Sequence, residues 1–146
     1  MYTLLVPKTG LWELQQVFDQ AMCRSCERST EFVWKRCREN EAAAIRQLND
    51  ALRSRAEGGT ILITAGIREK GGDFVDAALK VVAAFDDFTL DNDPRNEHDF
   101  GALEIHGEKI FFKLDYFDES MTTHSPDPTD PMLTRRVMTI MLAEEY

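Results

Sequence analysis

Apolar residues recur every three or four positions in two parts of the first third of the chain, which is the period of an amphipathic helix. The first part predicts a helix over residues 10–22. The second predicts a helix that begins near Ser29 or Thr30 and could continue through Asn40 into residues 41–56. Gly58-Gly59 follows, a pair that is typical of the end of a helix.

Three later segments have the pattern of strands. Residues 60–65 read Thr-Ile-Leu-Ile-Thr-Ala and are bounded by glycine, which predicts a strand. Residues 102–106 and 109–118 predict a hairpin, with Gly107-Glu108 as a two-residue type II′ turn. In that register Ile105 faces Ile110. The predicted core face of the hairpin holds Leu103, Ile105, Ile110, Phe112 and Leu114.

Two more helices complete the predicted architecture. One runs near 73–85 with Asp73 as its N-cap, and the other near 131–145 follows Asp130 and is apolar nearly all round. The sequence therefore predicts an α+β fold with a small, mainly antiparallel sheet, formed by the strand near 60–65 and the hairpin at 102–118. Helices near 41–56, 73–85 and 131–145 pack on it. The predicted domains are a helical N-terminal extension, 1–40, and a single α+β domain, 41–146.

Charge is distributed unevenly along the 146 residues. Residues 1–56 hold nine Lys and Arg against seven Asp and Glu, a balance of 9 − 7 = +2, and residues 57–146 hold eight against nineteen, a balance of 8 − 19 = −11. This acidic body disfavours direct binding to nucleic acid or to an anionic membrane, because both would repel it. It favours a basic protein partner, metal cations or simple solubility. Three cysteines without a secretion signal favour reduced thiols in a cytoplasmic protein.

Several motifs of the second half are similar to those of one bacterial family. They are Phe85-Asp-Asp-Phe-Thr, Asp91-Asn-Asp-Pro, Glu97-His-Asp-Phe-Gly101, Lys113-Leu-Asp-Tyr-Phe-Asp118, Ser125-Pro-Asp-Pro-Thr-Asp-Pro131 and Arg136-Val-Met-Thr-Ile-Met-Leu-Ala-Glu-Glu-Tyr146. The chain resembles, over about residues 41–146, an uncharacterised domain of unknown function that is common on plasmids and mobile elements of alphaproteobacteria. The resemblance implies an intracellular bacterial context, and it brings no activity or site residue with it.

The segment between residues 86 and 99 is the strongest candidate for a working surface. It holds five aspartates, one glutamate, one histidine and one arginine. Crowded carboxylates repel one another unless solvent, a cation or the positive groups of a partner relieve the repulsion. The candidate binding residues are Asp86, Asp87, Asp91, Asp93, Glu97, His98, Asp99, Asp115 and Asp118.

These residues, and the cysteines, match known catalytic and metal-binding motifs only in part. If the hairpin ladder continues beyond Gly101, His98 and Asp115 become diagonal neighbours, a pair suited to acid–base chemistry or to a metal site. A calcium loop starting at Asp91 fails, because glycine is absent from its sixth position and glutamate from its twelfth. The cysteines at 23, 26 and 37 resemble half of a zinc site, although free thiols are the simpler interpretation. No cofactor and no metal site are predicted.

The sequence thus favours a non-enzymatic acidic interaction protein of a bacterial mobile element. Its sharpest form is a nucleic-acid mimic that inhibits a host-defence nuclease, of the anti-restriction or anti-CRISPR type, because rows of carboxylates imitate phosphates. The predicted partner is a basic protein such as a host nucleic-acid enzyme, and residues 1–40 could also form a homodimer. The alternative is a metal-dependent hydrolase or nuclease that uses Asp91, Asp93, His98, Asp99 and Asp115.

Overall fold

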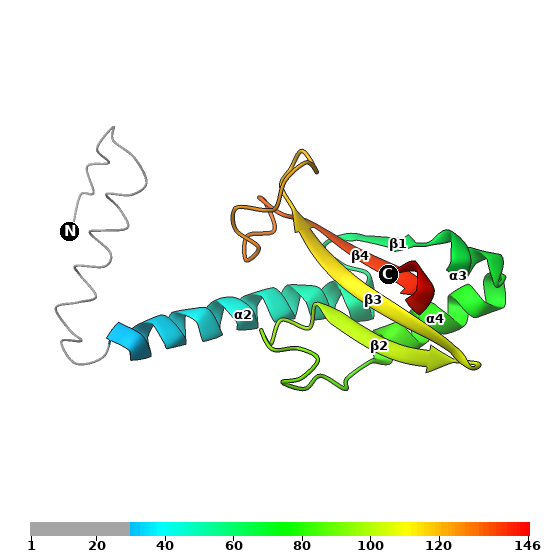
Figure 1. The fold of residues 1–146 in the computed structure, drawn as a ribbon. Coiled ribbons are helices and arrows are strands. Elements are labelled where there is room, and N and C mark those ends of the chain that lie inside the picture. Colours follow the sequence, from blue (N-terminus) through cyan, green and yellow to red (C-terminus); the bar gives the residue numbers. More distant parts are fainter. Residues whose placement is uncertain (1–29) are drawn as a thin grey trace. The chain divides into compact units, whose positions relative to one another are not determined.

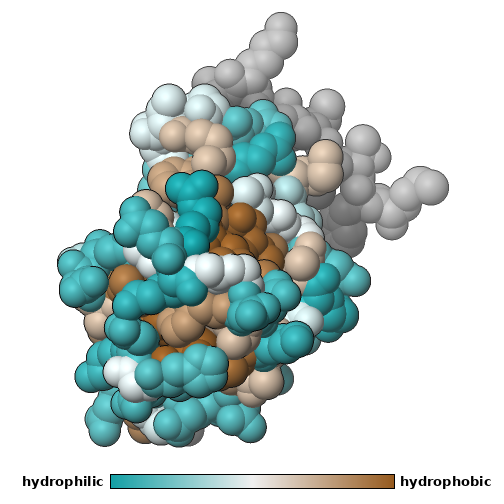
Figure 2. Space-filling model, turned by 90° about the vertical axis from the view of Figure 1, so that its right-hand side faces the viewer, coloured by the Kyte–Doolittle hydropathy of each residue, from teal (hydrophilic) through white to brown (hydrophobic). Residues whose placement is uncertain are grey.

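The computed structural model describes residues 30–146, with side chains from Lys35 onward (Figure 1). The chain divides into two units, residues 1–39 and 40–146. The first described helix, α2, spans Thr30–Arg55 without a break, which confirms the predicted start near Thr30 and the continuation through Asn40. The other described elements belong to the second unit, and Figure 2 shows hydrophilic residues around hydrophobic ones on one face of the molecule. The helix expected over residues 10–22, and the cysteines at 23 and 26, lie outside the described residues.

Four strands form one mixed sheet in the order β1-β4-β3-β2. Strand β1 (Thr60–Ile63) is parallel to β4 (Arg135–Leu142), and β3 (Glu108–Phe117) is antiparallel to both β4 and β2 (Phe100–Ile105). The predicted α+β fold with a mainly antiparallel sheet is confirmed.

The core lies between one face of this sheet and two helices, α2 and α4 (Gly72–Ala84). Both helices lie on the same side of the strands (Figure 1). The short helix α3 (Ala65–Glu69) follows β1 and contributes the fully buried Ile67. Side chains at helical spacing on α4 and at every second position of the strands meet there, so two different periods supply one apolar layer. The buried residues are Ile45, Leu52, Ile67, Phe74, Ala78, Val82, Ile105, Ile110, Phe112, Leu114, Tyr116, Met138, Ile140 and Leu142.

The hairpin turn differs from the predicted one. Ile105 pairs with Glu108, so the central residues are His106 and Gly107, with φ of 51° and 84°. Positive φ at both positions belongs to a type I′ turn, whose twist matches that of paired strands. Every pairing is therefore shifted by two residues from the predicted register. A shift of two keeps each side chain on its face, which is why the predicted core face is correct.

The predicted helix over 131–145 is wrong. That segment forms strand β4 and then the 3₁₀ turn η1 (Ala143–Glu145). Strand β4 lies between two other strands, and it buries Met138 and Ile140 on the helix side and Val137 and Met141 on the other. A strand that is buried on both faces is apolar at consecutive positions, and this pattern cannot be told from a buried helix by periodicity alone.

Two helix boundaries also differ from the prediction. Helix α4 is capped by Gly71, and Asp73 lies in its first turn rather than at the N-cap. Helix α3 begins at Ala65, the last residue of the strand predicted over 60–65. Its N-terminal backbone is bound by the Glu145 carboxylate, which accepts a hydrogen bond from the Gly66 N–H at 2.9 Å. That partner lies 79 residues away, so no local pattern indicates it.

Gly101 should be essential to the packing of β2 on the core. A Cβ added there would overlap the ring of the fully buried Phe112 and crowd Phe85. We expect Gly101→Ala to lower the free energy of unfolding by about 1–3 kcal/mol, the usual cost of overpacking. Gly72→Ala is the control, because nothing lies within 4 Å of its added Cβ, and it should be neutral or stabilise by up to about 1 kcal/mol. Urea titration measures both, and equal stability of the two variants would contradict the packing argument.

Candidate functional site

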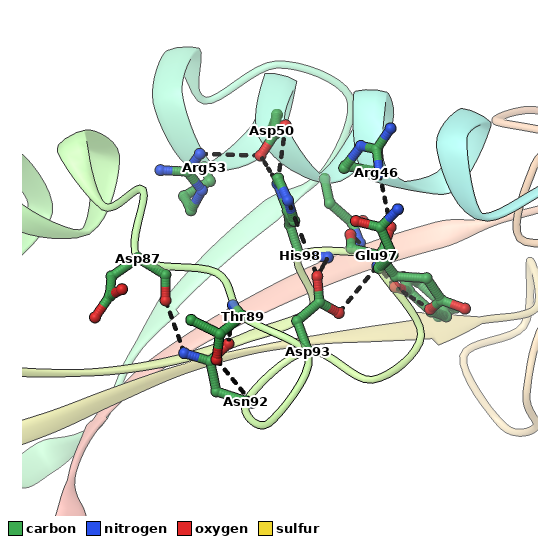
Figure 3. Close-up of polar contacts among 12 residues, drawn as sticks. Arg46, Asp50, Arg53, Asp87, Thr89, Asn92, Asp93, Glu97 and His98 are labelled. Carbon is green, nitrogen blue, oxygen red and sulfur yellow. Dashed lines mark hydrogen bonds and ion pairs between the residues drawn. The ribbon is translucent and has the colours of Figure 1, made fainter. Parts of the chain in front are cut away.

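The acidic loop, residues 86–99, connects α4 to β2 and supports its own shape. The Asn92 side chain donates a hydrogen bond to the Asp87 carbonyl at 2.7 Å, and it accepts one from the Thr89 N–H at 2.7 Å (Figure 3). The Asp93 N–H donates to the Thr89 carbonyl, also at 2.7 Å. Side-chain amides that bond nearby backbone in this way hold tight turns. The tip of the loop is thus a preformed structure.

Asp93 supports this loop from within. Its side chain is buried, with 3% of the residue exposed. One carboxylate oxygen accepts the Glu97 N–H at 3.0 Å and the other accepts the His98 N–H at 3.1 Å. Asn96 and His98 both have a φ of 57°, a conformation that is costly without such bonds. Asp93 therefore shapes the backbone and is not available to a partner.

His98 links the loop to helix α2. Its ring lies flat on that of Phe88, with 3.7 Å between centroids. Its Nδ1 lies 3.0 Å from Oδ1 of Asp50 (Figure 3). Its Nε2 lies 3.9 Å from the Asp93 carboxylate. Asp50 also accepts a hydrogen bond from Arg53 at 2.9 Å. The imidazole is thus held between two carboxylates from different elements.

Arg53 extends this link to helix α4. Its Nη1 donates to the carbonyls of Val82 and Ala83 at 3.1 and 3.0 Å in the last turn of that helix, where carbonyls lack the partners of a continuing helix. The Val82 carbonyl also accepts the Phe85 N–H at 3.2 Å. The guanidinium also lies 5.4 Å from the Phe88 ring centre. Helix α2 therefore binds the last turn of α4 through Arg53 and the far end of the acidic loop, at His98, through Asp50.

A buried polar cluster lies beneath the loop, made of Asn49, Glu97, Tyr116 and Arg136. Asn49 accepts a hydrogen bond from Arg136 Nε at 2.6 Å and donates to the Tyr116 hydroxyl at 2.7 Å, and that hydroxyl donates to the Glu97 carboxylate at 3.1 Å. Burial raises the pKa of Glu97 and of Tyr116 above their usual values, and it lowers the pKa of Arg136.

The predicted pairing of His98 with Asp115 is wrong, because β2 begins only at Phe100 and His98, with a φ of 57°, turns its ring to Asp50 on helix α2. Phe100 pairs with Lys113 rather than Asp115, and His98 binds Asp50. Asp115 lies 2.8 Å from Lys113 on the sheet face away from the core. The sequence did not identify Asp50 as a partner. The only local hint was Asn49-Asp50, which places a polar residue on the buried stripe of a helix.

The other predicted carboxylates separate into two groups. Asp99 is paired with Arg95. The carboxylate of Asp118 accepts bonds from the Ser120 hydroxyl and from the backbone N–H groups of Thr122 and Thr123, which lower its pKa to about 2. Asp86, Asp87 and Asp91 form the second group. They are exposed, and none has an ion pair within residues 30–146.

The residues proposed for a metal-dependent hydrolase do not converge. In the described part of the chain, no group of three or more His, Cys, Asp or Glu residues is arranged to hold a metal ion. The site consists of a loop that its own hydrogen bonds hold in shape, exposed carboxylates on that loop, and the buried polar cluster beneath it.

Comparison with known proteins identifies the family. Residues 63–145 match the family described as protein of unknown function (DUF3768), and since this is more than half of the chain, the chain belongs to that family. The match begins at the end of β1, later than the expected residue 41. No curated protein and no solved structure matches the chain. None of the helices within residues 30–146 has the length and apolar character needed to cross a membrane.

Asp93 and Asp91 should respond differently to the same substitution. Asp93→Asn would turn one acceptor oxygen into an amide donor that faces a backbone N–H, so we expect a loss of about 1–3 kcal/mol in the free energy of unfolding. Asp91→Asn is the matched control at an exposed position, and it should change that free energy by less than about 0.5 kcal/mol. Urea titration at neutral pH measures both. A similar cost at the two positions would refute the assigned role of Asp93.

Glu97 should make stability depend on pH. Burial raises the pKa of its carboxyl in the folded protein, so the stability that the protonated form contributes is complete below the unfolded pKa of about 4.3. That contribution is lost as the pH rises through the folded pKa. We therefore expect the stability of wild type relative to Glu97→Gln to fall between pH 4 and pH 7. Urea midpoints at several pH values test this, and a constant difference would contradict it.

Proposed function

We propose that this protein is a non-enzymatic interaction protein that presents its acidic loop to a basic partner protein. The observation that supports the proposal is that some carboxylates of the loop are bonded within the protein and others are not. Asp93 and Asp99 are occupied by internal bonds, whereas Asp86, Asp87 and Asp91 are exposed to solvent. Carboxylates that the fold does not use remain for a partner.

The loop also carries an apolar contact residue. Leu90 lies between the exposed carboxylates and is 82% exposed, the largest value among the exposed large apolar residues of the described chain. An apolar anchor surrounded by charge suits a partner with a small pocket inside a basic surface, because the anchor supplies contact energy and the charges supply attraction at a distance. The bonds around Asn92 hold this tip in shape before binding, which reduces the entropy lost in the complex.

The finer form of the proposal is an inhibitor that imitates nucleic acid. A net charge of −9 and a run of carboxylates suit the basic groove of a cytoplasmic nucleic-acid enzyme. We infer a host-defence nuclease as the target, in the manner of anti-restriction or anti-CRISPR proteins. The mobile-element context, which rests on the resemblance of the motifs, would make such an inhibitor useful to its carrier.

Neutralising the exposed carboxylates of the acidic loop should abolish capture of the partner. The test variant combines Asp86→Asn, Asp87→Asn and Asp91→Asn, and each single change should weaken capture only modestly because the charges act together. The control combines Glu69→Gln, Asp73→Asn and Asp76→Asn, which removes the same charge from exposed positions on α3 and α4. Binding of the wild type should also weaken steeply from low to physiological salt, where charges more than about 8–10 Å apart are screened.

The readout is quantitative capture from host extract followed by affinity measurement on the isolated partner. A partner that binds the loop variant as well as the control variant would disprove the role of the acidic loop. Competition with duplex DNA then tests the finer form, because a mimic and DNA need the same groove. A partner that saturating DNA fails to displace would exclude mimicry while leaving the loop as its binding surface.

A further inference from the structure

The second face of the sheet, opposite the helices, carries a pattern that the acidic loop does not explain. Side chains alternate along a strand, so the odd-numbered residues of β3 and β4 point away from the core formed by α2 and α4. In Figure 1, α2 and α4 lie on the opposite side of the strands, and the C-terminal turn lies against this face. Val137 and Met141, which point to this side, are buried within the chain. Within the described residues, the aromatic ring of Tyr146 reaches it and packs 5.6 Å from that of Phe111.

Along strand β3, the side chains on this face have opposite charges at equal distances from the centre of the strand. They are, in order, Lys109, Phe111, Lys113, Asp115, Phe117 and Glu119. Glu119 lies two residues beyond the strand and pairs with Arg135 of β4 at 3.5 Å. Leu114, on the core side, marks the centre. Two lysines lie on one side of that centre and two acids on the other, with a phenylalanine at the same distance in each direction. Reversing the strand therefore exchanges positive for negative charge and keeps the aromatic positions.

We propose that this face binds a second copy of the chain, sheet against sheet, with the two β3 strands antiparallel. The two-fold axis would lie between the two sheets, perpendicular to the strands and at the level of Leu114. Lys113 would then face Asp115 of the partner subunit, Phe111 would face Phe117 of the partner subunit, and Lys109 would face Glu119 of the partner subunit. A two-fold interface must be complementary to itself, and the order of side chains along β3 meets that requirement.

The neighbouring strands add one exposed apolar side chain to this contact. Leu62 of β1 is 50% exposed at one edge of the face, whereas Val137 and Met141 of β4, beside β3, are already buried within the chain. Sheets that pack face to face in this way keep their strands within about 30° of alignment. An approach of this kind would place β4 over β4 as well as β3 over β3.

The size of the face can be compared with that of a known dimer interface. Because Phe100 already pairs with Lys113, β2 would not lie over β2 of the second copy, and the facing strands are β1, β3 and β4. Their 4, 10 and 8 residues, about 4.8 Å apart and rising about 3.3 Å per residue, cover about 350 Å² in projection. Projecting side chains raise the accessible area above that figure, towards the roughly 800 Å² per partner of a standard interface.

The charges at the centre are available for such a contact. Lys113 and Asp115 form an ion pair of 2.8 Å within one chain, and their side chains remain 43% and 36% exposed. In the dimer each would gain a second partner, giving a cluster of four alternating charges. A single charge reversal would place like charges together within the chain and across the interface.

The test is the oligomeric state of the full chain, measured by sedimentation velocity over a range of concentrations. Wild type should dimerise, and Lys113→Glu should raise the dimer dissociation constant at least about tenfold, because it creates like-charge contacts. The double variant Lys113→Glu with Asp115→Lys restores opposite charges at every contact, so it should dimerise like wild type. Lys109→Glu, at an exposed position, is a second test that leaves the fold least disturbed.

Matched controls are Lys80→Glu alone and together with Asp76→Lys, at exposed positions on α4, and neither should alter the dimer. Circular dichroism establishes that each variant is folded. A monomeric wild type would overturn the proposal. So would a dimer that withstands both Lys113→Glu and Lys109→Glu, which would locate the contact elsewhere in the chain, or a double variant that stays dissociated.

Discussion

The fully buried side chain of Asn49 joins four parts of the molecule. Its amide oxygen accepts from Arg136 on β4, and its amide nitrogen donates to the Tyr116 hydroxyl on β3 and to the Glu97 carbonyl in the acidic loop, at 2.6–2.8 Å. A buried polar group costs free energy unless it is bonded, so these partners hold one another in a single arrangement. The position of helix α2 against the sheet, and of the loop above it, depends on this side chain.

The same cluster explains how an arginine is tolerated in the core. Arg136 is 1% exposed and sits on the helix side of β4, where its neighbours in the strand are apolar. Its guanidinium lies 5.2 Å from the centre of the Tyr116 ring and donates to the Pro128 carbonyl at 2.8 Å. The charge is thus compensated by neutral oxygens and an aromatic face, with Glu97 near by through Tyr116. One polar centre therefore ties the strand, the loop before it and helix α2 together.

The acidic loop shows how one composition can serve two purposes. The Asp93 carboxylate accepts backbone N–H groups and holds positive φ at Asn96 and His98, and Asp99 pairs with Arg95. Asp86, Asp87 and Asp91 are exposed to water. Building the loop from its own acidic residues leaves a rigid surface whose remaining charge can act on a partner without refolding. The second sheet face is different, because lysines and acids alternate with phenylalanines along β3, and the proposed contact with a second copy depends on that order.

Much of the architecture followed from local patterns in the sequence. The helical stripes of residues 41–56 and 73–85, the strand after Gly58-Gly59 and the core face of the hairpin all depend on side-chain period, and a two-residue error in register left that face intact. The acidic loop could likewise be located by composition alone.

What the sequence could not decide was set by contacts between distant residues. Residues 137–142 are apolar at every position except Thr139, and only the place of this segment between β1 and β3 makes it a strand instead of a helix. The pairing of His98 with Asp50 spans 48 residues, so no spacing rule could predict it. Only the tertiary structure decides which carboxylates are buried and bind the backbone and which are exposed. Asp91 and Asp93 are the same residue type, and only burial distinguishes them.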